Sequence, residues 1–372
     1  MAVANLLLTM PVYMLLPTMP RWLSTCQGFT ALEAGLSMGV FGVGLFTMGM
    51  FVSFLVQHYR RHQVCVLSIA VMAALLFAQY YLETELCQYV EFAYVVVHRF
   101  LLGAAFGLAQ MVLTSTLIID TCESYQRTEA NHSAAWFGRF ALSLGPLAGL
   151  ILERLFDFGM VLLVSLACLC VAILLILMVS FPFRAPSDDV ALVSLDRFFL
   201  SQGFPLFFNL QLIMIAVGFL LSLTLSEHFY AMVMAGFLLA IVAQRFVFRD
   251  AELKSEIVSG LILLAAALLM MLTHTQQVVV YAAPLFVGLG LGIIGSRFLL
   301  FFIKLSRHCQ RGTSHSTFML GWESGIAWGV GLGLALFAGD AKMALTAALV
   351  LIAVSLLDYH FVHDWFTRHK NR

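Results

Sequence analysis

The sequence predicts an all-α membrane protein with twelve transmembrane helices arranged as two pseudo-symmetric six-helix bundles. Three observations predict this fold class. Hydrophobic residues make up 62% of the 372 residues and charged residues only 11%, whereas a soluble protein of this length needs about twice that charge on its surface. Apolar stretches of bilayer-crossing length recur along the chain, and the mean hydropathy is +0.96. Sequence features of the first half also return in the second half.

The apolar stretches define the spans in chain order. A helix crosses the hydrocarbon core with roughly 20 residues, because it satisfies its own backbone polar groups in lipid. The twelve expected spans are 3–23, 34–56, 64–82, 90–118, 133–152, 159–182, 206–226, 229–248, 256–273, 277–303, 314–338 and 341–361.

The basic residues predict the orientation of these spans. Twelve crossings place both termini on one side, and lysines and arginines crowd the gaps on that side. The other side carries only Arg21, Arg154 and Lys342. Cytoplasmic loops are enriched in lysine and arginine, so we expect both termini in the cytoplasm.

The longest polar gap, 183–205, divides the chain into residues 1–182 and 206–372, which we expect to be the two six-helix bundles. We interpret the gap as a cytoplasmic linker. Within it, Leu192, Leu195 and Phe199 recur at helical spacing, so part of the linker could form a helix along the membrane surface.

Similar patterns at corresponding places favour an internal duplication. Span one begins NLLLTM at Asn5, and span seven begins NLQLIM at Asn209. A His-Ser pair at His132 precedes a glycine by six residues, and so does the pair at His315. Parallel repeats of this kind form transporters whose binding site lies at the repeat interface, near the bilayer midplane.

Four ionisable residues interrupt the spans and are candidates for function, because a charge in the membrane is costly. Arg99 in span four lies about 12 Å from the outer edge, and Glu323 in span eleven about 14 Å from the inner edge. Arg139 in span five and Arg297 in span ten are near enough to the inner ends to extend to water. Structural salt bridges are the alternative interpretation of these residues. His98, beside Arg99, is a further candidate for the cavity.

Two chemical roles remain open for this group. Glu323 is the carboxylate nearest the middle of a span. A buried carboxyl group favours its neutral form and a nearby arginine favours the charged form, so such a group can load and release a proton. If all four residues instead face one cavity, three arginines against one glutamate would attract an anionic substrate.

The composition argues against several other classes of protein. The net charge is zero, which gives no basic surface for nucleic acid. The seven cysteines and the histidines show no metal-binding spacing, and we expect neither a metal nor a cofactor. A nucleophile–base pair and a phosphate-binding loop are both missing, so we do not expect an enzyme. We expect a monomer in the bilayer that binds a small molecule and protons.

Small residues also follow Arg99 at regular spacing. Gly103 and Gly107 lie four and eight residues beyond it, on one helix face, where they allow close helix approach. With these residues in span four, the chain resembles the major facilitator superfamily, whose RxxxGxxxG pattern they match.

Span five is similar to the GxxxGPxxGG pattern of proton-coupled exporters in that family. Gly145, Pro146 and Gly149 match it, whereas Ala141 and Leu150 replace two glycines. The resemblance is therefore closest to bacterial efflux proteins.

The loop between spans two and three resembles the family's GxxxDRxGRR gating loop only in part. Arg60 and Arg61 keep its basic character, but the aspartate and both glycines are absent from residues 53–62. The resemblance assigns this loop to gating between the two halves.

The resemblance implies alternating access around a central cavity lined by spans 1, 2, 4, 5, 7, 8, 10 and 11. Our first hypothesis is a proton-coupled exporter of a small organic molecule in a bacterial inner membrane, with Glu323 carrying the proton and Arg99 tuning it. Nutrient uptake or organic-anion exchange, with Arg99 and Arg139 as counter-charges, is the alternative hypothesis.

Overall fold

The computed structural model describes residues 1–86, 89–123, 126–182, 190–247 and 252–370. Within these ranges it contains helices and no strand, and twelve helices are long and apolar enough to cross a membrane. All twelve expected spans are therefore found, and the predicted fold class is confirmed. The last helix runs to His369, eight residues past the expected end of span twelve at residue 361.

The first half holds six spans. They are α1 (Ala2–Thr25), α2 (Ala31–Thr47) with η1 (Gly49–Phe51) and α3 (Val52–His58), α4 (Arg61–Tyr81) with η2 (Leu82–Leu86), α5 (Phe92–Val112) with η3 (Leu113–Leu117) and α6 (Ile118–Asp120), α7 (Arg127–Leu155) and α8 (Phe158–Leu177).

The second half holds the other six. After the turn η4 (Ser201–Gly203) come α9 (Phe204–Leu221), α10 (Glu227–Phe246), α11 (Leu253–Thr273), α12 (Gln277–Leu305), then η5 (His308–Gln310), α13 (Arg311–Phe337) and α14 (Ala341–His369).

Local sequence explains where several spans begin. Thr30 forms a capping box with Glu33 at the start of α2. Asp157, Ser226 and Asp340 each accept a hydrogen bond from a backbone N–H of the first turn of α8, α10 and α14. Such caps satisfy N–H groups that have no partner within the helix. All four of these caps lie in gaps on the side away from the termini.

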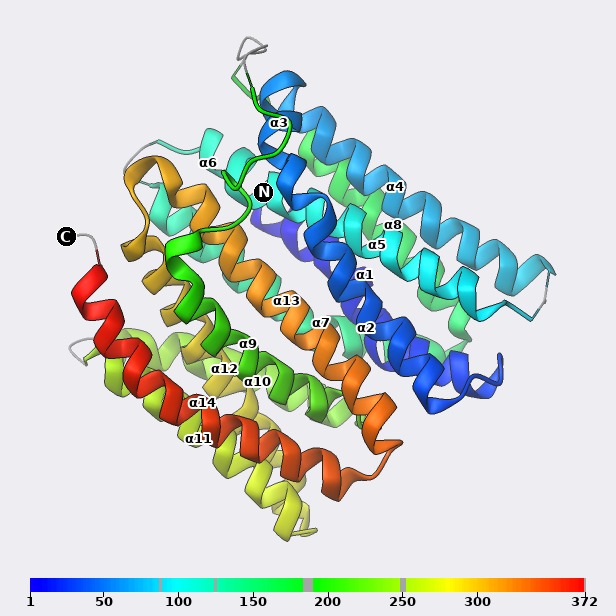
Figure 1. Ribbon diagram of the computed structural model, residues 1–372. Coiled ribbons are helices and arrows are strands. Elements are labelled where there is room, and N and C mark those ends of the chain that lie inside the picture. Colours follow the sequence, from blue (N-terminus) through cyan, green and yellow to red (C-terminus); the bar gives the residue numbers. More distant parts are fainter. Residues whose placement is uncertain (87–88, 124–125, 183–189, 248–251, 371–372) are drawn as a thin grey trace.

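The helices pack mainly within each half (Figure 1). In the first half α1 packs on α7 and α2 on α5, and in the second half α9 packs on α13 and α10 on α12. The halves meet where α2 contacts α13 and α7 contacts α10. We call this contact the seam. The extensive contacts across it do not involve α4, α8, α11 or α14, the four spans expected on the outside.

The seam runs between two faces of the molecule. The terminal face is the one that carries the start of α1, the end of α14 and residues 190–203 (Figure 1). The opposite face carries the short gaps after α1, α7 and α9.

The expected surface helix of the linker does not form over residues 190–200, which adopt turns and bends; residues 183–189 lie outside the described part of the chain. In place of a continuous helix, the linker forms short turns and also uses its backbone N–H groups to bond to the protein. The backbone N–H of Arg197 donates to Thr313 Oγ1 and that of Leu200 to Thr317 Oγ1, and Arg197 has a left-handed φ of 59°. We call residues 194–200 the strap.

Candidate functional site

Glu323 lies at the seam, where it connects the two halves. It is on α13 and accepts a hydrogen bond of 2.9 Å from Tyr13 Oη on α1. Both residues are buried, with 4% and 1% of their surface exposed. Gln110 of α5 also lies beside the carboxylate. The Tyr13–Glu323 hydrogen bond therefore joins the two halves in the buried interior.

Arg99 shares a small cavity with this pair. The cavity measures about 20 Å³, which is room for about one water molecule. We call it the central cavity, and its lining residues are Val12, Tyr13, Leu16, Met38, Phe41, Arg99, Glu323, Ile326, Ala327 and Val330.

Arg99 is 3% exposed, and its guanidinium carbon lies 5.0 Å from the centre of the Phe41 ring. Its Nε and Nη1 have no hydrogen-bond partner, and no ion pair joins it to Glu323 among the described residues. The site thus holds a buried arginine with spare donors, a carboxylate and a phenol around a space of water size.

Arg139 lies elsewhere on the seam. Its guanidinium stacks on Trp136 at 3.9 Å, and Nε donates to the carbonyl of Ala135. Nη1 reaches the carbonyl of Gly292 on α12 at 3.4 Å, so this side chain crosses between the halves. Its Nη2 has no partner.

His98 and Arg297 turn away from the central cavity. His98 Nε2 lies 3.0 Å from the carbonyl of Leu75 on α4, an outer helix. Arg297 Nε lies 2.5 Å from Glu256 Oε2 on α11, inside the second half. Arg297 therefore has the arrangement of the structural salt bridge that the sequence left as an alternative. The four intramembrane charges do not face one cavity.

The glycines of the two span motifs bring backbones together around the site. A Cβ at Gly103 would overlap the backbone of Phe41, and one at Gly107 would lie 2.7 Å from the carbonyl oxygen of Leu45. The α5–α2 contact therefore depends on both glycines, and it sets Phe41 beneath Arg99.

In α7, a Cβ at Gly145 would lie 2.6 Å from Tyr13 Cβ, and one at Gly149 equally close to the carbonyl oxygen of Met14. Pro146 is accommodated within the same helix. This contact between α7 and α1 positions Tyr13, which donates to Glu323.

The loop expected to gate the halves has one well-placed arginine. Arg61 Nη1 pairs with Asp120 Oδ2 at 2.5 Å at the terminal face, whereas Arg60 is exposed. Asp120 was not singled out from the sequence because it lies at the end of span four, where a charge is unremarkable.

Two further residues were missed. Tyr13 is one tyrosine in an apolar span, a pattern typical of ordinary packing, and its partner lies 310 positions away in the chain. Glu256 lies in the first turn of its span, where a glutamate is common because its negative charge stabilises the N-terminus of a helix. Among the described residues, no group of three or more His, Cys, Asp or Glu could hold a metal ion.

Comparisons with known proteins agree on the family and the fold. The family model described as Major Facilitator Superfamily matches residues 1–330. No curated protein matches the chain in sequence. The crystal structure of the human organic anion transporter MFSD10 (TETRAN) is similar with a TM-score of 0.69 and 16% identity, covering 96% of this chain and 97% of that one. The nucleoside transporter NupG is similar with a TM-score of 0.66 and 14% identity, covering 97% and 98%.

Proposed function

The chain belongs to the Major Facilitator Superfamily, and on that premise we propose that it is a proton-coupled exporter of a small organic molecule. The observation that carries the proposal is the hydrogen bond from Tyr13 of the first half to Glu323 of the second, in a cavity shared with Arg99. The bacterial inner membrane and cytoplasmic termini are part of the proposal, and the basic residues on the terminal side support that orientation.

The chemistry of the site supports coupling to a proton. In the closed seam, Glu323 is out of water and accepts from Tyr13. If the halves rock apart, this hydrogen bond has to break, because its donor and acceptor belong to different bundles. A carboxylate that loses its donor and remains in an apolar wall is stabilised by taking up a proton. Separation of the halves and protonation of Glu323 would then favour each other.

Arg99 would set the balance in this exchange. Its charge favours the ionised form of Glu323, and its unpartnered Nε and Nη1 can donate hydrogen bonds to a substrate. A substrate on Arg99 and a proton on Glu323 would then occupy neighbouring groups of one cavity, so that binding of one changes the affinity for the other, as coupled transport requires. The glycine contacts keep the positions of Arg99 and Tyr13 fixed.

Organic-anion exchange is the second candidate, favoured by the spare donors of Arg99 and by Arg139 Nη2, which has no partner either. The two functions differ in what Glu323 does. In the exporter it carries the proton, whereas in the anion exchanger only the arginines act on the substrate.

The test compares three variants in sealed vesicles containing a pH-sensitive dye. A transported compound is first identified as one that accumulates in the medium of cells that express the chain. Adding this compound to the wild-type vesicles should move protons. Glu323→Gln should abolish the proton movement, and Tyr13→Phe should reduce it. Glu153→Gln, which alters a carboxylate at the opposite face paired with Arg21, is the matched control and should behave as wild type. Compound exchange that is unaffected by pH and persists in Glu323→Gln would instead establish the anion exchanger.

A further inference from the structure

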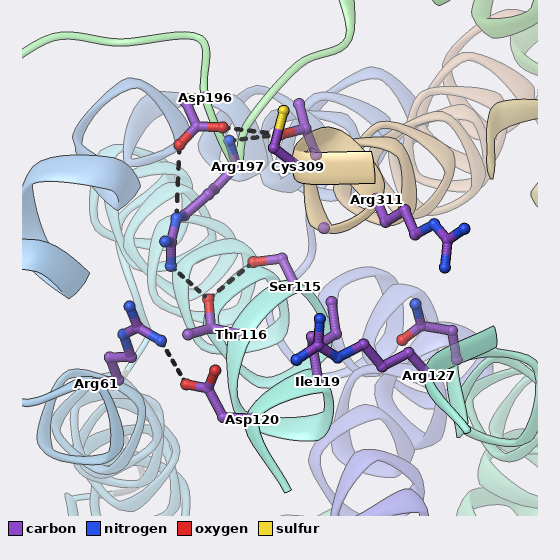
Figure 2. A pocket seen from close by; sticks show the side chains of 13 residues that line it. Arg61, Ser115, Thr116, Ile119, Asp120, Arg127, Asp196, Arg197, Cys309 and Arg311 are labelled. Atoms are coloured by element: carbon purple, nitrogen blue, oxygen red, sulfur yellow. Dashed lines mark hydrogen bonds and ion pairs between the residues drawn. The ribbon is translucent and has the colours of Figure 1, made fainter. Parts of the chain in front are cut away.

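A second, larger cavity opens where the two halves meet at the terminal face (Figure 2). Its volume is about 200 Å³, and we call it the terminal cavity. The lining side chains come from both halves and from the strap: Arg61, Ser115, Thr116, Ile119, Asp120, Arg127, Asn131, Asp196, Arg197, Cys309, Arg311, Gly312 and Thr313. None of them belongs to the central cavity.

The lining is positively charged. It contains four arginines and two aspartates, a formal charge of +2. Arg61 is paired with Asp120, and Arg197 lies 3.6 Å from Asp196. These two pairs account for both aspartates.

The remaining two arginines supply the excess charge. Among the described residues, Arg127 and Arg311 have no carboxylate partner, and Arg127 Nε is buried without a hydrogen bond. Figure 2 shows their side chains on the side of the cavity away from the Arg61–Asp120 pair.

Two long helices begin at this cavity. Arg127 is the first residue of α7 and Arg311 the first of α13, helices of 29 and 27 residues. The N-cap residues Gln126 and Gln310 make no side-chain cap hydrogen bond. The N–H groups of a first turn carry partial positive charge and bind anions. Both helices therefore add to the field of the arginines.

A buried amide faces the same space. Asn131 lies one turn into α7 and is 1% exposed, yet its Oδ1 has no hydrogen-bond partner. A side-chain amide can present either its oxygen or its NH₂ group, so it can accept from a hydroxyl of a partly protonated oxyanion or donate to one of its oxygens. The hydroxyls of Ser115 and Thr116 also line the cavity.

We propose that the terminal cavity binds a phosphate-bearing anion, held by Arg127 and Arg311 between the first turns of α7 and α13. The planar guanidinium matches phosphate oxygens with paired donors, and the volume accommodates a phosphate group with water. The phosphate belongs either to a soluble anion or to the headgroup of an anionic phospholipid. The proposal does not depend on which compound the protein transports.

Binding would act on the seam, because Arg127 belongs to the first half and Arg311 to the second. An anion that contacts both arginines offsets their mutual repulsion and holds the terminal face closed. It therefore stabilises the conformation described here over any conformation in which this face is open.

The experiment measures phosphate binding by the purified full-length chain. In detergent without added lipid, sodium phosphate is titrated against sodium chloride at equal ionic strength, with the melting temperature as the readout. In the second arm, nanodiscs of phosphatidylglycerol are compared with nanodiscs of phosphatidylcholine. Phosphate should raise the melting temperature above the chloride value. The double variant Arg127→Gln/Arg311→Gln should bind at least about tenfold more weakly, since each charge-assisted hydrogen bond is worth about that factor.

Arg245→Gln is the matched control, because this arginine is exposed near the terminal face and lies outside the cavity. If the double variant does not fold, Asn131→Asp provides the second test, since it keeps the shape and adds a repelling charge. A response in the detergent arm identifies a soluble anion, and a response only in phosphatidylglycerol identifies the lipid. Equal responses of the wild type and the cavity variants, or no response in either arm, would overturn the proposal.

Discussion

The seam between the halves is constructed differently at its two ends. Toward the opposite face, α2 and α13 meet backbone to backbone, since a Cβ on Gly331 would lie 2.7 Å from the carbonyl oxygen of Gly35. Toward the terminal face, the halves meet through the strap, through side-chain hydrogen bonds and around a charged cavity. Hydrogen bonds between the halves can be replaced by hydrogen bonds to water at little net cost. Water cannot replace the close backbone packing at the glycine contact. The comparison predicts that the terminal end opens more readily than the other end, where the glycine contact would act as a pivot.

The strap shows how the terminal end is held. Asp196 Oδ1 accepts from Thr313 on α13, and its Oδ2 lies 3.5 Å from Ser53 on α3. Arg197 donates to Thr116 in the first half. The loop after span two lacks the acidic residue of the family's gating loop, and the strap places a carboxylate at the start of α13 instead.

Removal of the Phe198 side chain, which anchors the strap, should have the largest effect on the stability of the terminal end. Phe198 is buried against Gly49 and contacts Phe46 of the first half edge to face. Phe198→Ala should cost about 3–5 kcal/mol. With the native cysteines replaced by serine, because Cys309 lines the same cavity, it should also speed maleimide labelling of a reporter cysteine introduced as Ser115→Cys. Phe199→Ala is the control, because Phe199 packs on Phe207 of its own half. Equal labelling rates in both variants would show that the strap does not hold this face.

Loss of the Arg61–Asp120 ion pair at the terminal cavity should have the second-largest effect. Asp120→Asn removes the carboxylate partner of Arg61, and a hydrogen bond between charged groups contributes about 1.5–3 kcal/mol. Denaturation of the purified protein should show this loss. Glu123→Gln, which alters an exposed carboxylate in the same gap, should leave stability unchanged. A loss of similar size in both variants would point to general charge effects instead of the pair.

Crowding of the pivot should have a smaller but distinct effect. A Cβ at Gly35 would lie 2.5 Å from the carbonyl oxygen of Gly331, whereas one at Gly39 would lie 3.7 Å from the nearest atom. Gly35→Ala should therefore destabilise the protein by about 1–3 kcal/mol and slow transport. Gly39→Ala should be tolerated. The pivot interpretation is wrong if the two substitutions have the same effect on transport.

The smallest effect is expected at the rim of the opposite face. Arg154 and Glu227 pair across the halves at 3.1 Å, but the arginine side chain is 65% exposed. Exposed ion pairs contribute about 0–1 kcal/mol, so Glu227→Gln should change the melting temperature only slightly, and less still at high salt. A large loss here would show that the opposite face also depends on charge.

The sequence predicted the features that depend on local pattern. The twelve spans follow from apolar length, and the buried positions of Arg99 and Glu323 follow from their depth within those spans. Partners could not be predicted in the same way. Tyr13 reaches Glu323 only after the halves meet, and Arg297 finds Glu256 on a neighbouring helix. Which charges share a cavity depends on helix rotation and on packing between distant segments, neither of which the spacing of one sequence specifies.

The strap also determines how strongly the seam itself has to bind. Residues 194–200 are fixed to α13 and also contact the first half. Only residues 178–193 separate them in the sequence from the end of α8, so the covalent connection between the bundles is short. A short tether presents each bundle to the other at an effective concentration on the order of millimolar. The halves therefore remain together even when the direct affinity between their surfaces is weak. The hydrogen bonds of the seam can therefore break and re-form while the covalent connection keeps the two bundles together.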